Sequence, residues 1–192
     1  MNVIKVILVV VFLNLCACYG YASSRIKLNF DFDWKFSLTD HPGYAAIDYS
    51  DANWEQVQLP HDWNIKQKFD RKGIGSAAYL PEGIGWYRKT FFVPQSYKGR
   101  TVSILFDGIF QQSDVYINGK QVGYSEDSFS PHAFDVTDYL NKDGENLLAV
   151  EVHKFCDGTW FEDQDMLYDG GIFRDVYLYS APLVQISDYA VE

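Results

Sequence analysis

The sequence predicts an all-β domain, a β-sandwich or jelly roll. Three observations support this fold class. Short apolar runs alternate with polar residues from Phe30 onward, without a long stripe of helical period. Turn residues separate these runs at intervals typical of antiparallel sheets. Aromatic residues form 17% of the chain, including 14 Tyr and 14 Phe, and they favour a pleated, half-buried surface.

Five segments carry the strand pattern. The first stops at Pro94, and the second places Val102, Ile104 and Phe106 on one face. The third contains Asn118-Gly119 between two apolar runs, which is the strongest short signal for a β-hairpin. The last two are apolar alternations near the C-terminus. In order, the predicted strand segments are residues 86–93, 101–107, 114–124, 146–153 and 175–179.

Two long stretches interrupt the strand rhythm. Residues 60–85 are rich in Gly, Lys and Asp, whereas residues 157–171 combine acidic and large aromatic side chains. Long ordered loops gather at the ends or edges of a sandwich and usually carry function. These two loops are therefore the candidate functional regions. A short helical turn is predicted within residues 134–140.

The first 22 residues are predicted to be an export signal rather than part of the fold. The positive start at Lys5 precedes an apolar run, residues 6–13, which is too short to span a bilayer stably. Gly20-Tyr21-Ala22 then supplies the small-x-small pattern of a signal-peptidase site. The mature domain is expected to span residues 23–192 and to be periplasmic or secreted.

A lipoprotein signal is the alternative. Leu15-Cys16-Ala17-Cys18 resembles a bacterial lipobox, in which residues 1–17 form the signal and Cys18 is the lipidated first residue. The mature domain then keeps only Cys156 besides the lipidated residue, so internal disulfides cannot hold it together. Cys156 is predicted to be a small buried hydrophobe and not a catalytic thiol.

The charge and the motifs narrow the classes of function. A net charge of −10, from 26 acids and 16 bases, argues against nucleic acid or anionic lipid as the main partner. The sequence contains no Gly-rich phosphate loop and no Gly-x-Ser-x-Gly nucleophile elbow. The histidines lack metal-ligand spacing, so no zinc site is expected; they are His41, His61, His132 and His153.

Several residues admit both a structural and a functional interpretation. His61-Asp62-Trp63 could suggest an acid–base pair, but a capped turn with Trp63 in the core is the favoured interpretation. Tyr79 and Trp86 could stack on a sugar, although a β-rich core uses such residues too. Gly170-Gly171 is expected to supply backbone freedom where the loop re-enters the sheet. Paired carboxylates suggest glycoside hydrolysis, in which two acids flank the bond that is cleaved. A lone sandwich, however, offers no pocket that surrounds a sugar ring.

The chain resembles the N-terminal sugar-binding domain of glycoside hydrolase family 2, the group of β-galactosidases, β-glucuronidases and β-mannosidases. The resemblance covers nearly the whole mature chain, and its acidic motif is most similar to the β-galactosidase branch. The matching stretches are "LPHDW" (59–63), "GIGWYRKTFFVP" (83–94), "FDGIFQQSDVYINGKQVGYSEDSFSPHAFDVTDYL" (106–140), "ENLLAVEV" (145–152), "DGTWFEDQDMLYDGGIFRDVYLY" (157–179) and "QISDYAVE" (185–192).

The resemblance implies roles for particular residues. Asp165, the last acid of "EDQD", is implied to reach a neighbouring catalytic domain, where it holds the galactosyl 6-hydroxyl and a sodium ion. Trp160 and Phe161 are implied to support this loop by packing on that domain. Asp157 and Glu126 match part of a structural Mg²⁺ site, although Glu126 replaces a Gln and the remaining ligands have no match in residues 23–35.

The implied function is the sugar-binding domain of an exported bacterial β-galactosidase-like glycoside hydrolase. In that family this domain is a galactose-binding-like jelly-roll β-sandwich. An immunoglobulin-like domain and a TIM barrel follow it, and the two catalytic glutamates lie in the barrel. No catalytic residue is therefore expected in this chain, and the 192 residues are expected to be a fragment. A free-standing carbohydrate-binding module and a domain used only for interdomain packing are the alternatives.

Overall fold

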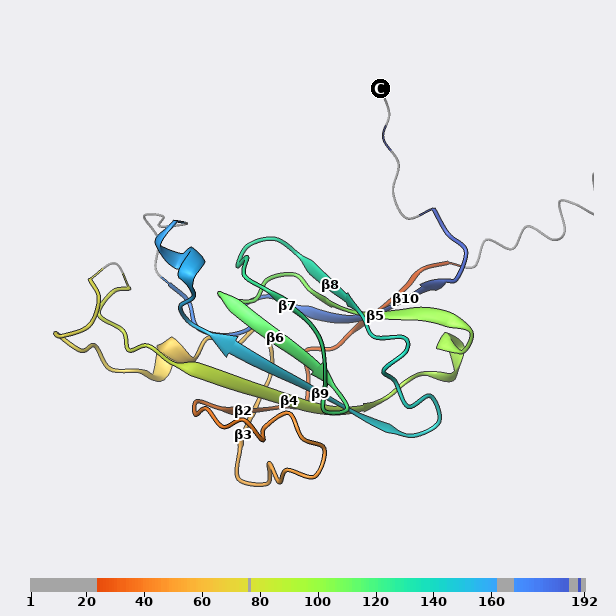
Figure 1. The fold of residues 1–192 in the computed structure, drawn as a ribbon, viewed down its shortest axis with the longest axis horizontal. Helices are drawn as coiled ribbons and strands as arrows, with labels where there is room; N and C mark the ends of the chain where they lie inside the picture. The colour runs from red at the N-terminus through yellow and green to blue at the C-terminus, as the bar shows by residue number, and fades with distance from the viewer. Residues whose placement is uncertain (1–23, 76, 162–167, 187–189, 191–192) are drawn as a thin grey trace, which may run out of the picture.

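The computed structural model describes residues 24–75, 77–161, 168–186 and 190, apart from the side chain of Trp160. Two antiparallel sheets pack face to face (Figure 1). One sheet has the strand order β1-β10-β5-β8, and the other has the order β3-β2-β4-β9-β6-β7. Within these described residues there is no α-helix, and no helix there is long and apolar enough to cross a membrane. The predicted all-β sandwich is confirmed.

Along the described residues, short strands follow one another, with three single-turn 3₁₀ helices between them. The strands are β1 (Ile26–Asn29), β2 (Trp34–Ser37), β3 (Glu55–Val57), β4 (Ile84–Phe92), β5 (Arg100–Phe106), β6 (Gln112–Ile117), β7 (Lys120–Ser125), β8 (His132–Asp135), β9 (Glu145–His153) and β10 (Val176–Pro182). The 3₁₀ helices are η1 (Trp63–Lys66), η2 (Gln95–Tyr97) and η3 (Asp157–Trp160).

All five strand segments predicted from the sequence are confirmed, with boundaries shifted by a few residues. The hairpin also forms as predicted. Ile117 of β6 pairs with Lys120 of β7, and Asn118 and Gly119 take the positive φ angles, 51° and 78°, that this two-residue turn requires. The prediction of a helical turn within 134–140 is wrong, because this segment contains no helix. It finishes β8 and then forms an isolated turn, in which Tyr139 N–H donates to the Val136 carbonyl.

The core lies between the two sheets and follows from the alternation of the strands. On β5, Val102, Ile104 and Phe106 point inward as predicted and are almost fully buried. They face inward-pointing side chains of β4, β6 and β9 in the other sheet, among them Tyr87 and Val150. A single hydrophobic cluster therefore joins the sheets and fixes the strand ends from which the long loops leave.

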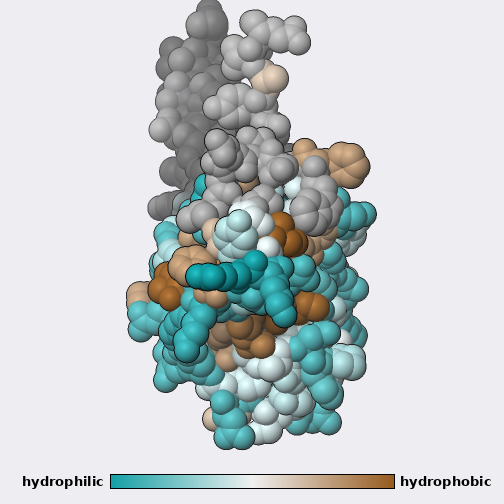
Figure 2. Space-filling model, turned by 90° about the vertical axis from the view of Figure 1, so that its left-hand side faces the viewer, coloured by the Kyte–Doolittle hydropathy of each residue, from teal (hydrophilic) through white to brown (hydrophobic). Residues whose placement is uncertain are grey.

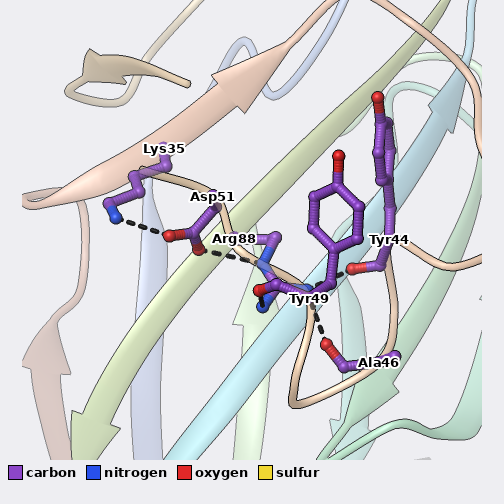
Figure 3. Close-up of polar contacts among 6 residues, drawn as sticks. All are labelled: Lys35, Tyr44, Ala46, Tyr49, Asp51 and Arg88. Carbon is purple, nitrogen blue, oxygen red and sulfur yellow. Dashed lines mark hydrogen bonds and ion pairs between the residues drawn. The ribbon is translucent and has the colours of Figure 1, made fainter. Parts of the chain in front are cut away.

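A loop, residues 38–54, covers the outer face of the six-stranded sheet. Arg88 of β4 is 3% exposed and holds this loop through four contacts (Figure 3). Its guanidinium donates to the carbonyls of Tyr44, Ala46 and Tyr49 and to a carboxylate oxygen of Asp51 at 2.9 Å. Because Arg presents five N–H donors in a rigid fork, one side chain fixes several turns of the loop.

Candidate functional site

The two long stretches that interrupt the strand pattern lie together at one end of the sandwich (Figure 1). The first connects β3 to β4 and contains η1, and the second connects β9 to β10 and contains η3. Backbone hydrogen bonds join them directly. His61 N–H donates to the Ile172 carbonyl at 2.8 Å, and Trp63 N–H donates to the Gly170 carbonyl at 3.0 Å. The sandwich thus brings the two candidate regions into one structural unit, called the loop end below.

The segment His61-Asp62-Trp63 forms the base of the loop end. The Asp62 carboxylate caps η1 by accepting from Asn64 N–H at 2.8 Å, and it also accepts from Gly170 N–H at 3.0 Å. Trp63 is 2% exposed, and its ring stacks on Phe36 with the centroids 5.7 Å apart. The predicted capped turn with a core tryptophan is confirmed, and these residues form no acid–base pair.

His61 also has a structural role. Its Nδ1 lies 2.7 Å from the hydroxyl of Tyr87, a fully buried residue of β4. Burial lowers the pKa of His61, so the ring favours its neutral form, and burial raises the pKa of Tyr87 well above its usual value. The pair satisfies two polar groups inside the sandwich.

A buried lysine and an asparagine link the stems of both loops. Asn64 donates from its amide to the Tyr168 carbonyl at 2.8 Å and accepts from Lys154 Nζ at 2.9 Å. Lys154 is fully buried and also donates to the Pro81 carbonyl at 3.1 Å. Burial lowers the pKa of Lys154, although the nearby acids Asp62 and Asp169 oppose this shift. The sequence analysis missed both residues.

Gly170 and Gly171 are needed for space as well as for backbone freedom. A Cβ on Gly170 would lie 2.5 Å from the indole of Trp63. Gly171 has φ +119°, and a Cβ there would lie 2.2 Å from the Tyr87 hydroxyl and 2.7 Å from the His61 carbonyl oxygen. The predicted role of the glycines where the loop re-enters the sheet is confirmed, and close packing on the base of the loop end is added to it.

The other stem of the acidic loop is held by a threonine. Thr159 donates to the side-chain carbonyl of Gln111, and its hydroxyl accepts from Cys156 N–H at 2.9 Å. Cys156 itself is free and only half-buried, with its sulfur 3.7 Å from Gln111 Oε1. The prediction that Cys156 is a small buried hydrophobe is therefore corrected, because the residue is only partly buried and caps η3 instead of packing in the core.

The residues assigned to sugar and metal binding have different outcomes. Asp165 lies outside the described residues, as does the side chain of Trp160. Phe161 is 92% exposed directly after η3. Asp157, at the start of η3, and Glu126, after β7, are both exposed carboxylates. Of the described residues, one group of three or more possible metal ligands lies close enough for one ion, and it contains neither Asp157 nor Glu126.

The surface of the loop end mixes apolar and polar groups (Figure 2). Ile65 and Phe69 of the first loop are 83% and 76% exposed, and they accompany Phe161 of the second loop. Tyr79 is half-exposed on the first loop, whereas Trp86 is buried beneath Tyr44 on the outer face of the sheet. Trp86 is thus a core residue and does not face a sugar.

These features define the class of the protein: an all-β sandwich domain with two long loops joined at one end, where apolar and acidic side chains reach the surface. Residues 27–182 match the family described as "Glycosyl hydrolases family 2, sugar binding domain". The chain therefore belongs to this family of sugar-binding domains, as the sequence motifs predict.

Three known proteins are similar to this chain. A β-galactosidase of Priestia megaterium is 40% identical over 158 residues, which cover 82% of this chain and 14% of the relative. A β-galactosidase of Bacteroides ovatus is 36% identical over 170 residues, covering 86% and 19%. The crystal structure of a β-glucuronidase of Bacteroides uniformis matches with a TM-score of 0.73 and 28% identity, covering 83% and 18%. The chain spans less than a fifth of each of these proteins.

Proposed function

We propose that this sugar-binding domain serves a β-galactosidase-like glycoside hydrolase, and that its acidic loop completes the galactoside site. The observation that supports this most is the loop end itself. Segments more than one hundred positions apart are joined by hydrogen bonds such as Asn64 to Tyr168 and Asp62 to Gly170. A loop held at its stems in this way has a lower entropic cost for binding a ligand.

The proposed roles divide along the loop. Phe161 is exposed and apolar, so it suits docking on a neighbouring domain of the same enzyme, with Trp160 beside it in the sequence. The neighbouring domains proposed are an immunoglobulin-like domain and a catalytic TIM barrel. The carboxylate of Asp165 is proposed to accept hydrogen bonds from a sugar hydroxyl and to bind Na⁺, a hard cation that prefers oxygen. The catalytic nucleophile and acid/base are assigned to the barrel and not to this chain.

The proposed Mg²⁺ site fits less well. Carboxylate oxygens suit Mg²⁺, and both Asp157 and Glu126 are exposed. However, Mg²⁺ requires about six oxygen ligands in octahedral geometry, so two side chains supply only part of its shell. The described residues form no three-membered acidic group around Asp157 and Glu126. A role for these two residues in Mg²⁺ binding therefore needs ligands from elsewhere.

Substrate preference tests the proposal. The whole protein should hydrolyse aryl β-galactosides faster than aryl β-glucuronides, because the acidic loop disfavours an anionic sugar near Asp165. Residues 23–192 alone should release no aglycone above a heat-killed control. Faster cleavage of the glucuronide would overturn the galactoside assignment. Binding of glycans by the whole protein without any cleavage would instead support a free-standing carbohydrate-binding module.

We also propose that the protein is exported. The support comes from Lys5, the apolar run of residues 6–13 and the cleavage pattern Gly20-Tyr21-Ala22. N-terminal sequencing of the protein from its native host should begin after Ala22, or should be blocked at a lipidated Cys18. An intact Met1 would contradict both forms of the proposal.

A further inference from the structure

Three potential metal ligands meet on the outer face of the six-stranded sheet. Asp114 lies on β6, directly opposite Glu151 on β9. His153 follows Glu151 by two residues on the same face of β9. One ligand atom from each of the three side chains lies within 4.8 Å of the others. This group uses none of the residues that the family resemblance assigns to metals.

The local charges favour a cation here. Carboxylates directly opposite each other on neighbouring strands repel, and Asp114 and Glu151 are held in this position by the register of β6 and β9. The side chains of Glu151 and His153 are only 16% and 25% exposed, so water screens the repulsion incompletely. His153 Nε2 lies 2.9 Å from Glu151 Oε1, so the imidazole is the neighbour that this carboxylate has at the position where a cation would bind.

Neighbouring side chains hold the ligands in place. Gln121 and Gln112 donate from their amides to the two carboxylate oxygens of Asp114, at 2.6 and 3.2 Å. Such contacts orient a carboxylate while leaving lone pairs for a metal. Asp40 accepts a hydrogen bond from Trp86 Nε1 at 3.3 Å. Its negative charge interacts electrostatically with His153 and so adds to the negative potential at the site. The ligands also lie on the central strand β9 and its neighbour, whose backbones are fixed by pairing.

We propose that Asp114, Glu151 and His153 bind one divalent transition-metal ion of the Zn²⁺ type. One imidazole nitrogen with two carboxylate oxygens is a ligand set that Zn²⁺ accepts, with water in the fourth position. Hard cations such as Mg²⁺ and Ca²⁺ prefer six or more oxygens and no nitrogen. Ligands about 2.0–2.2 Å from a tetrahedral Zn²⁺ lie roughly 3.4 Å apart, so small rotamer changes close this site.

The sequence analysis expected no zinc site because the histidines lack metal-ligand spacing. The sequence does contain a pattern that fits a metal site: Glu151 and His153 are two residues apart on one strand. Glu151 lies opposite an acid on the neighbouring strand. A strand places residues i and i+2 on one face, whereas the usual motif spacing describes turns and helices. Only the pairing of β6 with β9 adds Asp114 to the set.

The site is tested with the whole protein, purified without a histidine tag and stripped with a chelator. Titration with ZnCl₂ should show one site, and CoCl₂ should give the visible absorption bands of a protein-bound ion. His153→Gln and Glu151→Gln should each weaken Zn²⁺ binding at least about tenfold. The matched control is His132→Gln, on β8 of the other sheet, which should bind Zn²⁺ like the unchanged protein.

A second measurement needs no variant, so it holds even if a substitution impairs folding. Diethyl pyrocarbonate modifies accessible imidazoles, and mass spectrometry locates the product. Zn²⁺ should protect His153 and leave the exposed His41 reactive. The proposal is overturned if Zn²⁺ leaves His153 as reactive as before, if the ligand variants bind Zn²⁺ as well as the control, or if Mg²⁺ displaces Zn²⁺ at equal concentration.

Discussion

The carboxylate of Asp62 accepts a hydrogen bond from the backbone N–H of Gly170 at 3.0 Å, across 108 positions of the sequence. The same oxygen caps η1 through Asn64 N–H at 2.8 Å. One side chain therefore fixes the start of the first long loop and the end of the second. Hydrogen bonds to a charged acceptor are stronger than neutral ones, so this contact contributes to the stability of the loop end.

Removing this carboxylate should destabilise the fold. Asp62→Ala loses a helix cap and a charge-assisted hydrogen bond, and it should lower the free energy of unfolding by about 2–3 kcal/mol. Urea denaturation measures the change. The matched control is Asp70→Ala, because the Asp70 carboxylate is exposed and accepts a hydrogen bond from the nearby Lys72 N–H. The control should lose no more than about 0.5 kcal/mol. Equal losses would contradict the proposed link between the loops.

Gly171→Ala should be severely destabilising. A Cβ at this position meets the Tyr87 hydroxyl at 2.2 Å and a backbone carbonyl at 2.7 Å, in addition to the strain of φ +119°. Together these terms should cost at least about 3 kcal/mol. Gly99→Ala is the comparison, since Gly99 has φ +73° but no atom within 4 Å of the added Cβ. It should cost about 1 kcal/mol in a thermal melt. Similar melting temperatures for the two variants would show that packing at Gly171 is unimportant.

His61 should make the stability depend on pH. Burial lowers the pKa of His61 in the folded state below its unfolded value of about 6.5. A group with a depressed folded pKa contributes stability above its unfolded pKa and loses it as the pH falls through the folded pKa. His61→Gln should therefore lose less stability than the unchanged protein between about pH 7 and pH 5. Urea midpoints at the two pH values measure this; parallel losses in both proteins would contradict it.

Arg88→Lys should release the loop of residues 38–54 from the sheet. A lysine ammonium cannot reproduce the fork that holds three carbonyls and Asp51, so the loss should be at least about 2 kcal/mol. Chymotrypsin should then cleave faster within the loop. Lys35→Met is the control: Lys35 binds the same carboxylate at 2.5 Å but is 44% exposed, and such a pair contributes under about 1 kcal/mol. Unchanged cleavage in Arg88→Lys would contradict the account.

Local patterns predicted the parts of the fold that depend on neighbouring residues. The hairpin at Asn118-Gly119, the capped turn at Asp62 and the five longer strand segments are of this kind. The strands β1, β2, β3 and β8 have four residues or fewer, too few for a periodic pattern to stand out. Their partners, and not their own sequences, make them strands.

The buried polar contacts could not be predicted in the same way. Lys154 and Asn64 lie 90 positions apart, and nothing near Lys154 distinguishes it from a surface lysine. The alternation of β4 places Arg88 on the outer face of the sheet, where a side chain is normally exposed. Arg88 is buried because the loop of residues 38–54 folds over it. Asp165 was assigned through family resemblance and lies outside the described residues, so its role remains a prediction that kinetics must test.

The central proposal is that the acidic loop completes a galactoside site, and Asp165→Ala in the whole protein tests it most directly. The measurement is kcat/KM for an aryl β-galactoside and for its 6-deoxy analogue. Losing a charge-assisted hydrogen bond to the 6-hydroxyl costs about 1.5–3 kcal/mol, or roughly a ten- to hundredfold drop on the galactoside. The drop should be much smaller on the analogue, with the melting temperature nearly unchanged. Equal drops on both substrates, or no drop on the galactoside, would contradict the claim.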